Sequence, residues 1–209
     1  AKLPEFTEIG VFLMREIRDR LTEEARQIFF AASIFRQPPP VSLVLDVLRE
    51  GKLITDSPRA AVMIRDGLAH QRGLMTIDAE DHVQMHDIIR DFWRGLLQEP
   101  EKSTLHRAVL AIFQEEQKGG KSRILVSEAA YHYFEIRESA AAFELLQKNY
   151  QDLLSTQQAS SALSTLTAFK VHHFPEQSSQ WVDVLLLRGD LQRLLGQYEE
   201  AIASYGEAQ

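Results

Sequence analysis

The sequence predicts a mainly α-helical protein of two domains, with one small β-hairpin inside the first domain. Apolar residues recur every three to four positions through most of the 209 residues, which is the period of an amphipathic helix. The period changes to two between Leu74 and Met85, as expected for short strands. From residue 101 onward every segment has the helical period again, so we place the domain boundary between residues 1–100 and 101–209.

Helical segments precede the hairpin in the first domain. Ile9–Leu21 has one apolar face and is expected to form an N-terminal linker helix. Thr22 stands before two glutamates, which predicts the start of the next helix, and Pro38–Pro40 predicts its end. Two further helices are expected over residues 43–48 and 59–71.

The hairpin and the helix after it complete the first domain. Two β-type runs, Leu74–Ile77 and His82–Met85, flank a polar, turn-like segment over residues 78–81. An amphipathic helix follows over residues 88–97, and Pro100 closes it. Three helices, a two-stranded hairpin and a following helix are the element order of a winged-helix domain.

The second domain is predicted to consist of helices alone. Short polar loops separate them, which favours antiparallel helix pairs stacked into a superhelix. The expected helices cover residues 105–117, 124–136, 140–150, 159–169 and 181–195, with a last one from Gln197 onward.

The C-terminal segment resembles a tetratricopeptide repeat (TPR). Small residues let paired helices approach closely, and aromatic residues fill the groove between stacked pairs. Arg188 replaces the leucine of the repeat pattern, and an ordinary helical hairpin is the alternative. Such repeats bind peptides or partner proteins in a concave groove. The matching residues are Gly189, Gly196, Tyr198, Ala201, Tyr205 and Ala208.

Composition excludes several classes of function. The chain has no cysteine, which excludes a disulfide scaffold, a thiolate metal site and a cysteine nucleophile. The net charge is −7, and residues 1–100 hold 13 basic and 16 acidic residues, so we expect no nucleic-acid partner. No apolar run approaches the roughly 20 residues that cross a bilayer, and we expect a cytoplasmic protein without a membrane partner. The chain stops inside a helical pattern, so we expect a piece of a longer protein.

Met85, His86 and Asp87 lie where the hairpin leads into the following helix. Asp87 is placed to cap that helix, and His86 would then stand at a fixed corner, with a ring N–H free to reach a phosphate oxygen. The spacing alone favours a purely structural explanation. Met85 would then belong to the core, Asp87 would only cap the helix, and His86 would be an exposed turn residue.

The stretch Val83–Phe92 resembles the MHD motif of the STAND class (NB-ARC/NACHT-like) of signal-transduction ATPases. In that class a nucleotide-binding domain is followed by a winged helix and then by a repeat sensor. Residues Arg20–Pro39 are similar to the first winged-helix segment of bacterial members, and the order of winged helix and TPR-like helices is similar as well. The resemblance covers nearly the whole chain.

The resemblance implies a role for each residue of the motif. His86 would contact the β-phosphate of ADP, Asp87 would stabilise the loop that presents it, and Met85 would pack under the hairpin. The phosphate-cradling loop and the Mg²⁺-binding carboxylates of the class are missing from this chain, so we expect no catalysis and no cofactor here. ADP or ATP with Mg²⁺ would bind the longer parent, an ATPase.

We therefore expect a non-catalytic regulatory and sensor fragment of a STAND ATPase. Its partners would be the nucleotide-binding domain of the same parent and a protein or peptide trigger that the helical repeats bind. One alternative is a winged-helix DNA-binding transcription regulator with a helical dimerisation arm, and another is a TPR-type protein-interaction scaffold. The recognition helix of the DNA-binding alternative would present Arg59, Arg65, His70, Gln71 and Arg72.

Other patterns in the sequence are not expected to form sites. Gly119–Ser122 contains Gly-Lys-Ser, but Glu115 stands where a phosphate-binding loop needs glycine and the preceding segment is helical. His82 and His86 on one strand would be roughly 13 Å apart, too far to share a metal ion. His172–His173 is a loop pair with no partner at ligand spacing. We predict no metal site and no catalytic residue.

Overall fold

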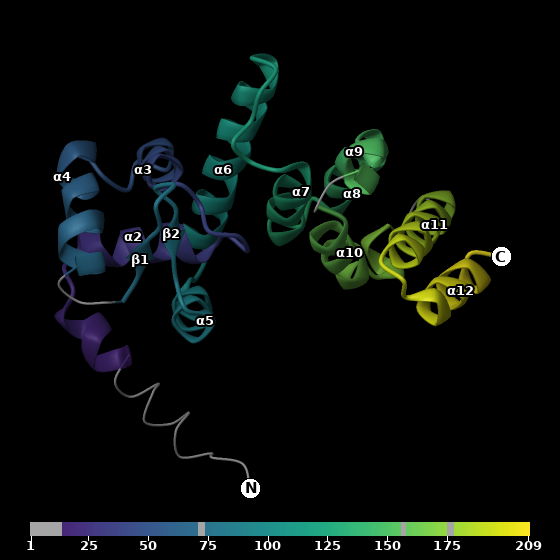
Figure 1. Cartoon of the computed structure of the whole chain (residues 1–209), viewed down its shortest axis with the longest axis horizontal. Helices are drawn as coiled ribbons and strands as arrows, with labels where there is room; N and C mark the ends of the chain where they lie inside the picture. The colour runs from purple at the N-terminus through teal and green to yellow at the C-terminus, as the bar shows by residue number, and fades with distance from the viewer. Residues whose placement is uncertain (1–13, 71–73, 156–157, 175–177) are drawn as a thin grey trace, which may run out of the picture. The chain divides into compact units, whose positions relative to one another are not determined.

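The computed structural model describes residues 14–70, 74–155, 158–174 and 178–209 (Figure 1). The protein is mainly helical, as the sequence predicts, and the described residues form a single two-stranded sheet. The predicted linker helix is helical over residues 14–20, and its earlier part lies outside the described residues. The chain divides into two compact units, unit 1 (Ala1–Ile112) and unit 2 (Phe113–Gln209). The division falls inside α6 (Glu101–Lys118), whereas the sequence predicts a boundary before this helix.

Unit 1 is organised around α2 (Glu23–Ser33). The Thr22 hydroxyl accepts a hydrogen bond from the Ala25 amide at 3.2 Å, so Thr22 caps this helix as predicted. Most of α2 is buried, and its C-terminus at Ser33 comes before the proline run. The elements that pack against it are α3 (Val41–Glu50), α4 (Ser57–Val62), the π-helix η1 (Met63–His70) and α5 (Asp87–Leu96).

Helix α5 is held against α2 at two points. Trp93 is fully buried and stacks on Phe29, with ring centroids 4.7 Å apart and an interplanar angle of 9°. The neighbouring Arg94 donates to the carbonyl oxygens of Ser33 (2.9 Å) and Phe35 (3.2 Å). These carbonyls lie at the C-terminal end of α2, where backbone oxygens lack intrahelical partners. The position of α5 on α2 is therefore fixed by both packing and hydrogen bonds.

The hairpin consists of β1 (Thr76–Ile77) and β2 (Val83–Gln84), which pair antiparallel with Ile77 opposite Val83. Both strands are shorter than the predicted runs. The proline run extends the sheet, since the Val41 amide donates to the Asp81 carbonyl and the Val83 amide donates to the Pro39 carbonyl, each at 2.8 Å. Residues that the sequence predicts only as a helix terminator thus hold one edge of the hairpin.

The predicted helix over residues 59–71 forms as two different elements. Asp56 caps α4 through a hydrogen bond from the Arg59 amide at 3.0 Å. The wider η1 continues the chain from Met63, and it buries Ile64 and Leu68. Residues 71–73, which include the end of the predicted helix, lie outside the described residues.

Unit 2 contains helices that pack mainly on their neighbours (Figure 1). Helix α7 packs on α8 and α10, α10 packs on α11, and α11 packs on α12. The short α9 lies between the predicted helices over residues 140–150 and 159–169, where the sequence predicts a loop. The elements are α7 (Val126–Glu135), α8 (Ser139–Lys148), α9 (Tyr150–Ser155), α10 (Gln158–Ala168), the 3-10 helix η2 (Val171–His173), α11 (Ser178–Leu194) and α12 (Tyr198–Glu207).

The last helix pair depends on small residues for its close approach. A Cβ atom at Gly189 would lie 2.4 Å from the Tyr205 ring, so only glycine fits there. Gly196 has φ +77°, and the Gln197 amide donates to the Gln192 carbonyl at 2.9 Å, which ends α11 as glycine commonly does. Tyr205 also donates its hydroxyl to Asp190 at 2.8 Å. In the part of the chain that the structure describes, no helix combines the length and apolar character needed to cross a membrane.

Candidate functional site

His86 stands at the corner between β2 and α5. Its backbone is extended (φ −60°, ψ 139°), and it occupies the N-cap position of α5. Its Nδ1 atom accepts a hydrogen bond from the Ile88 amide at 3.3 Å. Because Nδ1 is an acceptor, the proton of a neutral ring lies on Nε2. The side chain is exposed, so this N–H is available to a ligand or a neighbouring domain.

Asp87 does not cap α5, contrary to the sequence prediction. It is the first residue of the helix, and its side chain, 76% exposed, pairs with Arg90 three residues further on. The prediction was wrong because aspartate ranks high among capping residues, whereas the extended backbone that the cap requires falls one residue earlier. An acidic residue in the first helical turn still stabilises α5 through the helix dipole.

Met85 and Asp87 line a hollow of about 210 Å³ beside the start of α5, here called the α5 hollow. Arg90 also lines it, donating to the Arg36 carbonyl at 3.5 Å, while its buried Nε atom has no hydrogen-bond partner among the described residues. Met85 is half-buried, and His86 is not one of the lining residues. The lining residues are Ala32, Phe35, Gln37, Pro38, Pro39, Val83, Gln84, Met85, Asp87 and Arg90.

The corner offers one outward hydrogen-bond donor and no obvious nucleophile. His86 is exposed and its Nε2–H takes no part in the cap, whereas the Arg90 guanidinium nearby is already paired with Asp87. The His86 N–H can donate a hydrogen bond, as phosphate oxygens require. The structure therefore places the three predicted residues at one corner, with different roles: His86 caps the helix and faces out, Asp87 pairs with Arg90, and Met85 lines the hollow.

The hairpin tip is acidic and largely satisfied by its own hydrogen bonds. Asp78 accepts from the amides of Glu80 (3.0 Å) and His82 (2.9 Å) and from the Gln84 side chain (2.9 Å). The bonds from His82 and Gln84 are the main causes that lower the pKa of Asp78. A carboxylate therefore organises the tip, and the lysine or arginine expected in a DNA-reading wing is missing from residues 78–81.

Two cations of the predicted DNA-reading helix are paired with carboxylates. Arg65 bonds Asp81 at 2.8 Å, and Arg59 lies 3.4 Å from Glu24. Gln71 and Arg72, which belong to the same prediction, lie outside the described residues. The pairing lowers the positive charge that this surface offers to phosphates.

The Gly-Lys-Ser triplet lies in the loop between α6 and α7. Glu116 accepts hydrogen bonds there from the Ser122 hydroxyl (3.1 Å) and from the Arg123 amide (2.8 Å). A carboxylate therefore occupies the inside of this loop, where a phosphate-binding loop presents open amides. The preceding segment is helical, as predicted.

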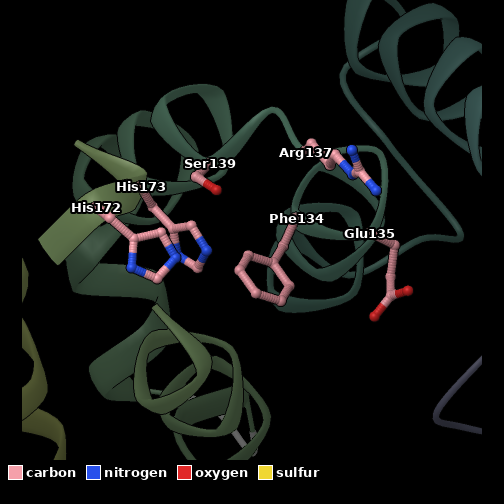
Figure 2. A pocket seen from close by; sticks show the side chains of 6 residues that line it. All are labelled: Phe134, Glu135, Arg137, Ser139, His172 and His173. Atoms are coloured by element: carbon pink, nitrogen blue, oxygen red, sulfur yellow. The ribbon is translucent and has the colours of Figure 1, made fainter. Parts of the chain in front are cut away.

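A second hollow, of about 680 Å³, is lined in part by His172 and His173, which the sequence predicts to form no site (Figure 2). His172 and His173 lie in η2, with ring centroids 4.4 Å apart. The hollow also involves residues 134–139, at the junction of α7 and α8. Sequence reasoning missed it because more than thirty positions separate the two segments and only tertiary packing joins them.

No protein-family model, curated protein or solved structure matches the chain. Among the described residues, no three histidine, cysteine, aspartate or glutamate side chains are grouped as metal ligands would be. The function of the chain therefore has to be inferred from its own residues.

Proposed function

We propose that the chain is the non-catalytic regulatory part of a cytoplasmic STAND-class signalling ATPase. Unit 1 acts as a winged helix that senses ADP through Met85, His86 and Asp87, and unit 2 begins a TPR-like array that binds a protein or peptide trigger. The observation that carries the proposal is the exposed His86, whose Nδ1 caps α5 and whose Nε2–H faces outward.

The element order of unit 1 supports a winged helix. After the linker helix, α2, α3 and the continuous α4–η1 segment precede the hairpin, the chain at Pro39–Val41 pairs along its edge, and α5 follows directly. The acidic hairpin tip and the paired Arg59 and Arg65 favour a domain contact over DNA binding. These features favour the regulatory role over the DNA-binding alternative.

The mechanism would use the rigid connection between His86 and the core of unit 1. The His86 N–H would donate to a β-phosphate oxygen, whose negative charge strengthens such a hydrogen bond. Because Trp93 and Arg94 fix α5 on α2, a shift of the corner is passed to the centre of unit 1. ADP at one site and a trigger at unit 2 would then bias one two-state equilibrium.

The close pairing of α11 and α12 supports a TPR-like unit 2. Gly189 faces the Tyr205 ring, and Ala201 is buried between the helices, as the repeat pattern requires of its small residues. The plain interaction scaffold would use the same helices without any role for His86. The two possibilities therefore differ only in what happens at the α5 corner.

Two substitutions of His86 test the proposal in the full-length parent. His86→Asn keeps a good N-cap, but its shorter side-chain amide does not reach the position of the outward Nε2–H, whereas His86→Ala removes both the cap and the donor. Loss of one hydrogen bond to a charged oxygen should speed ADP release by about 10-fold or more in both variants. His82→Asn, on the hairpin, is the matched control and should retain ADP normally. Normal ADP retention by His86→Asn would mean that His86 acts only as a helix cap. The chain would then be better described as a TPR-type interaction scaffold.

A further inference from the structure

The larger hollow in unit 2 lies at the N-terminus of α8, and we call it the α8 hollow. Its volume is about 680 Å³, and none of its residues belongs to the α5 corner. It combines an apolar wall with several hydrogen-bond donors. The lining residues are Phe134, Glu135, Arg137, Ser139, His172 and His173 (Figure 2).

Ser139 supplies a hydroxyl that opens into the α8 hollow. It is the first residue of α8, only 7% exposed, and its hydroxyl has no hydrogen-bond partner among the described residues. Figure 2 shows this hydroxyl pointing into the hollow, between the histidine pair and Phe134. The hydroxyl oxygen is not fully buried, and it can donate a hydrogen bond to a ligand oxygen in the hollow.

The start of α8 adds backbone donors beside Ser139. The first amides of a helix have no intrahelical carbonyl to bind, and the N-cap residue Glu138 accepts none of them through its side chain. These amides and the helix dipole favour an anion at this end of the helix.

Arg137 contributes a cation from an unusual backbone position. It ends α7 with φ +66°, where the Glu138 amide donates to the Tyr133 carbonyl at 2.9 Å. Glycine adopts this left-handed conformation without strain, so an arginine costs stability that its side chain has to offset. The guanidinium is exposed and has no ion pair in the described part of the chain.

His173 provides a donor from the opposite wall. Its Nδ1 atom accepts a hydrogen bond from the Lys170 amide at 3.0 Å, so Nε2 carries the proton of the neutral ring. Burial, with smaller contributions from His172 and Lys170, lowers the pKa of His173 and keeps this neutral form at pH 7. The ring edge packs against Phe134, with centroids 5.5 Å apart, which fixes its orientation.

Donors therefore surround the hollow from several directions. Ser139 lies at one wall and the histidine pair at another, whereas Arg137 lines the far side with its side chain extended away from them (Figure 2). The Glu135 carboxylate is turned away from the histidines in the same view, so it does not occupy the space between the donors. A phosphate monoester has three terminal oxygens that accept hydrogen bonds from different directions. A carboxylate has only two oxygens, and they lie in one plane.

We propose that the α8 hollow binds a phosphate monoester, carried by the peptide partner of unit 2. The site itself is independent of the α5 corner, and only the identity of the carrier rests on the proposed function. Phe134 would pack beside the side chain that carries the phosphate, and the remaining volume would hold the adjoining peptide.

Titration of inorganic phosphate into the 209-residue chain tests the site, with the ¹⁵N and ¹H shifts of the His172 and His173 rings as the readout. We expect saturable shifts in the unmodified chain. Ser139→Ala and Arg137→Gly should each bind phosphate about 5-fold to 10-fold more weakly, because each variant loses one charge-assisted hydrogen bond. Arg137→Gly should melt no lower than the parent chain, which separates lost binding from lost folding. Lys121→Ala, a cation in the Gly-Lys-Ser loop, is the matched control and should bind normally.

Peptide titrations identify the carrier. A phosphoserine peptide should displace inorganic phosphate, and the same peptide with unmodified serine or with glutamate should not. Absence of saturable shifts, or loss of binding only in Lys121→Ala, would overturn the site. Binding of phosphate or ADP without competition from the phosphopeptide would overturn the carrier. Neither result depends on His86→Asn, so failure here is distinguishable from failure of ADP sensing.

Discussion

Units 1 and 2 are both helical, but their cores are built in different ways. In unit 1 the helices α3, α4 and α5 and the π-helix η1 all pack on α2. In unit 2 the contacts run from each helix to its neighbours, through α7, α10, α11 and α12. A core with one central helix holds a corner such as His86 in a fixed position, whereas a series of neighbour contacts presents an extended surface. The comparison suggests why sensing and partner binding would be divided between them.

The largest effect should follow removal of the aromatic side chain that joins α5 to α2. Trp93→Ala should lower the free energy of unfolding of unit 1 by about 3–5 kcal/mol, because Trp93 is fully buried and stacked on Phe29. Urea unfolding followed by circular dichroism measures it. Ile88→Ala, on the same helix but 66% exposed, should stay within about 0.5 kcal/mol of the parent. If both variants unfold alike, α2 is not the centre of unit 1.

Acid should destabilise unit 1 through a buried histidine of α6. Burial, together with Lys102 and Arg94, lowers the pKa of His106 to about 3 from an ordinary value near 6.5. Below pH 6.5 the His106 side chain is protonated in the unfolded chain, whereas in the folded chain it stays neutral until the pH falls to about 3. Stability should therefore fall as the pH drops from 6.5 toward 3, by up to about 1.4 kcal/mol per pH unit. His106→Gln should flatten this dependence, and an unchanged slope would show that other groups of unit 1 cause it.

A smaller and more local effect is expected at the α11–α12 pair. Gly189→Ala places a methyl group against the Tyr205 ring and should destabilise unit 2 by about 1–3 kcal/mol. In a Trp181→Phe background, Trp93 fluorescence reports unit 1 alone, so its transition should not move. A parallel shift of the Trp93 transition would contradict the separation of the two cores.

The smallest effect should be a gain in stability in the same helix pair. Nothing lies within 4 Å of a Cβ atom added at Gly206, which is inside α12. Gly206→Ala should therefore stabilise α12 by up to about 1 kcal/mol, through the higher helix propensity of alanine. Thermal unfolding measures this gain. A loss of stability instead would mean that the helix pair does not tolerate side chains at either glycine.

Local signals in the sequence predict much of the fold. Thr22 caps α2, the segments at α5 and α6 are helical close to their predicted bounds, and Gly189 meets Tyr205 as the repeat spacing indicates. These features depend on residues that are near one another in the chain. The π-helix η1 has the same apolar period as an ordinary helix over so short a span, so its form was not predictable.

The candidate sites were less predictable because they depend on neighbours that the chain brings from a distance. The choice of His86 over Asp87 as the cap depends on the backbone at the end of β2, which propensity does not specify. The edge pairing of Pro39 with Val83 and the hollow that Ser139 and His173 both line each join separate segments. Tertiary packing alone creates these arrangements.

The rate of ADP release from full-length protein that carries His86→Asn tests the central claim most directly. Since asparagine preserves the cap and its shorter amide does not reach the position of the outward Nε2–H, we predict release about 10-fold or more faster than from the unmodified protein. An unchanged rate, with α5 still folded, would contradict nucleotide sensing at this corner.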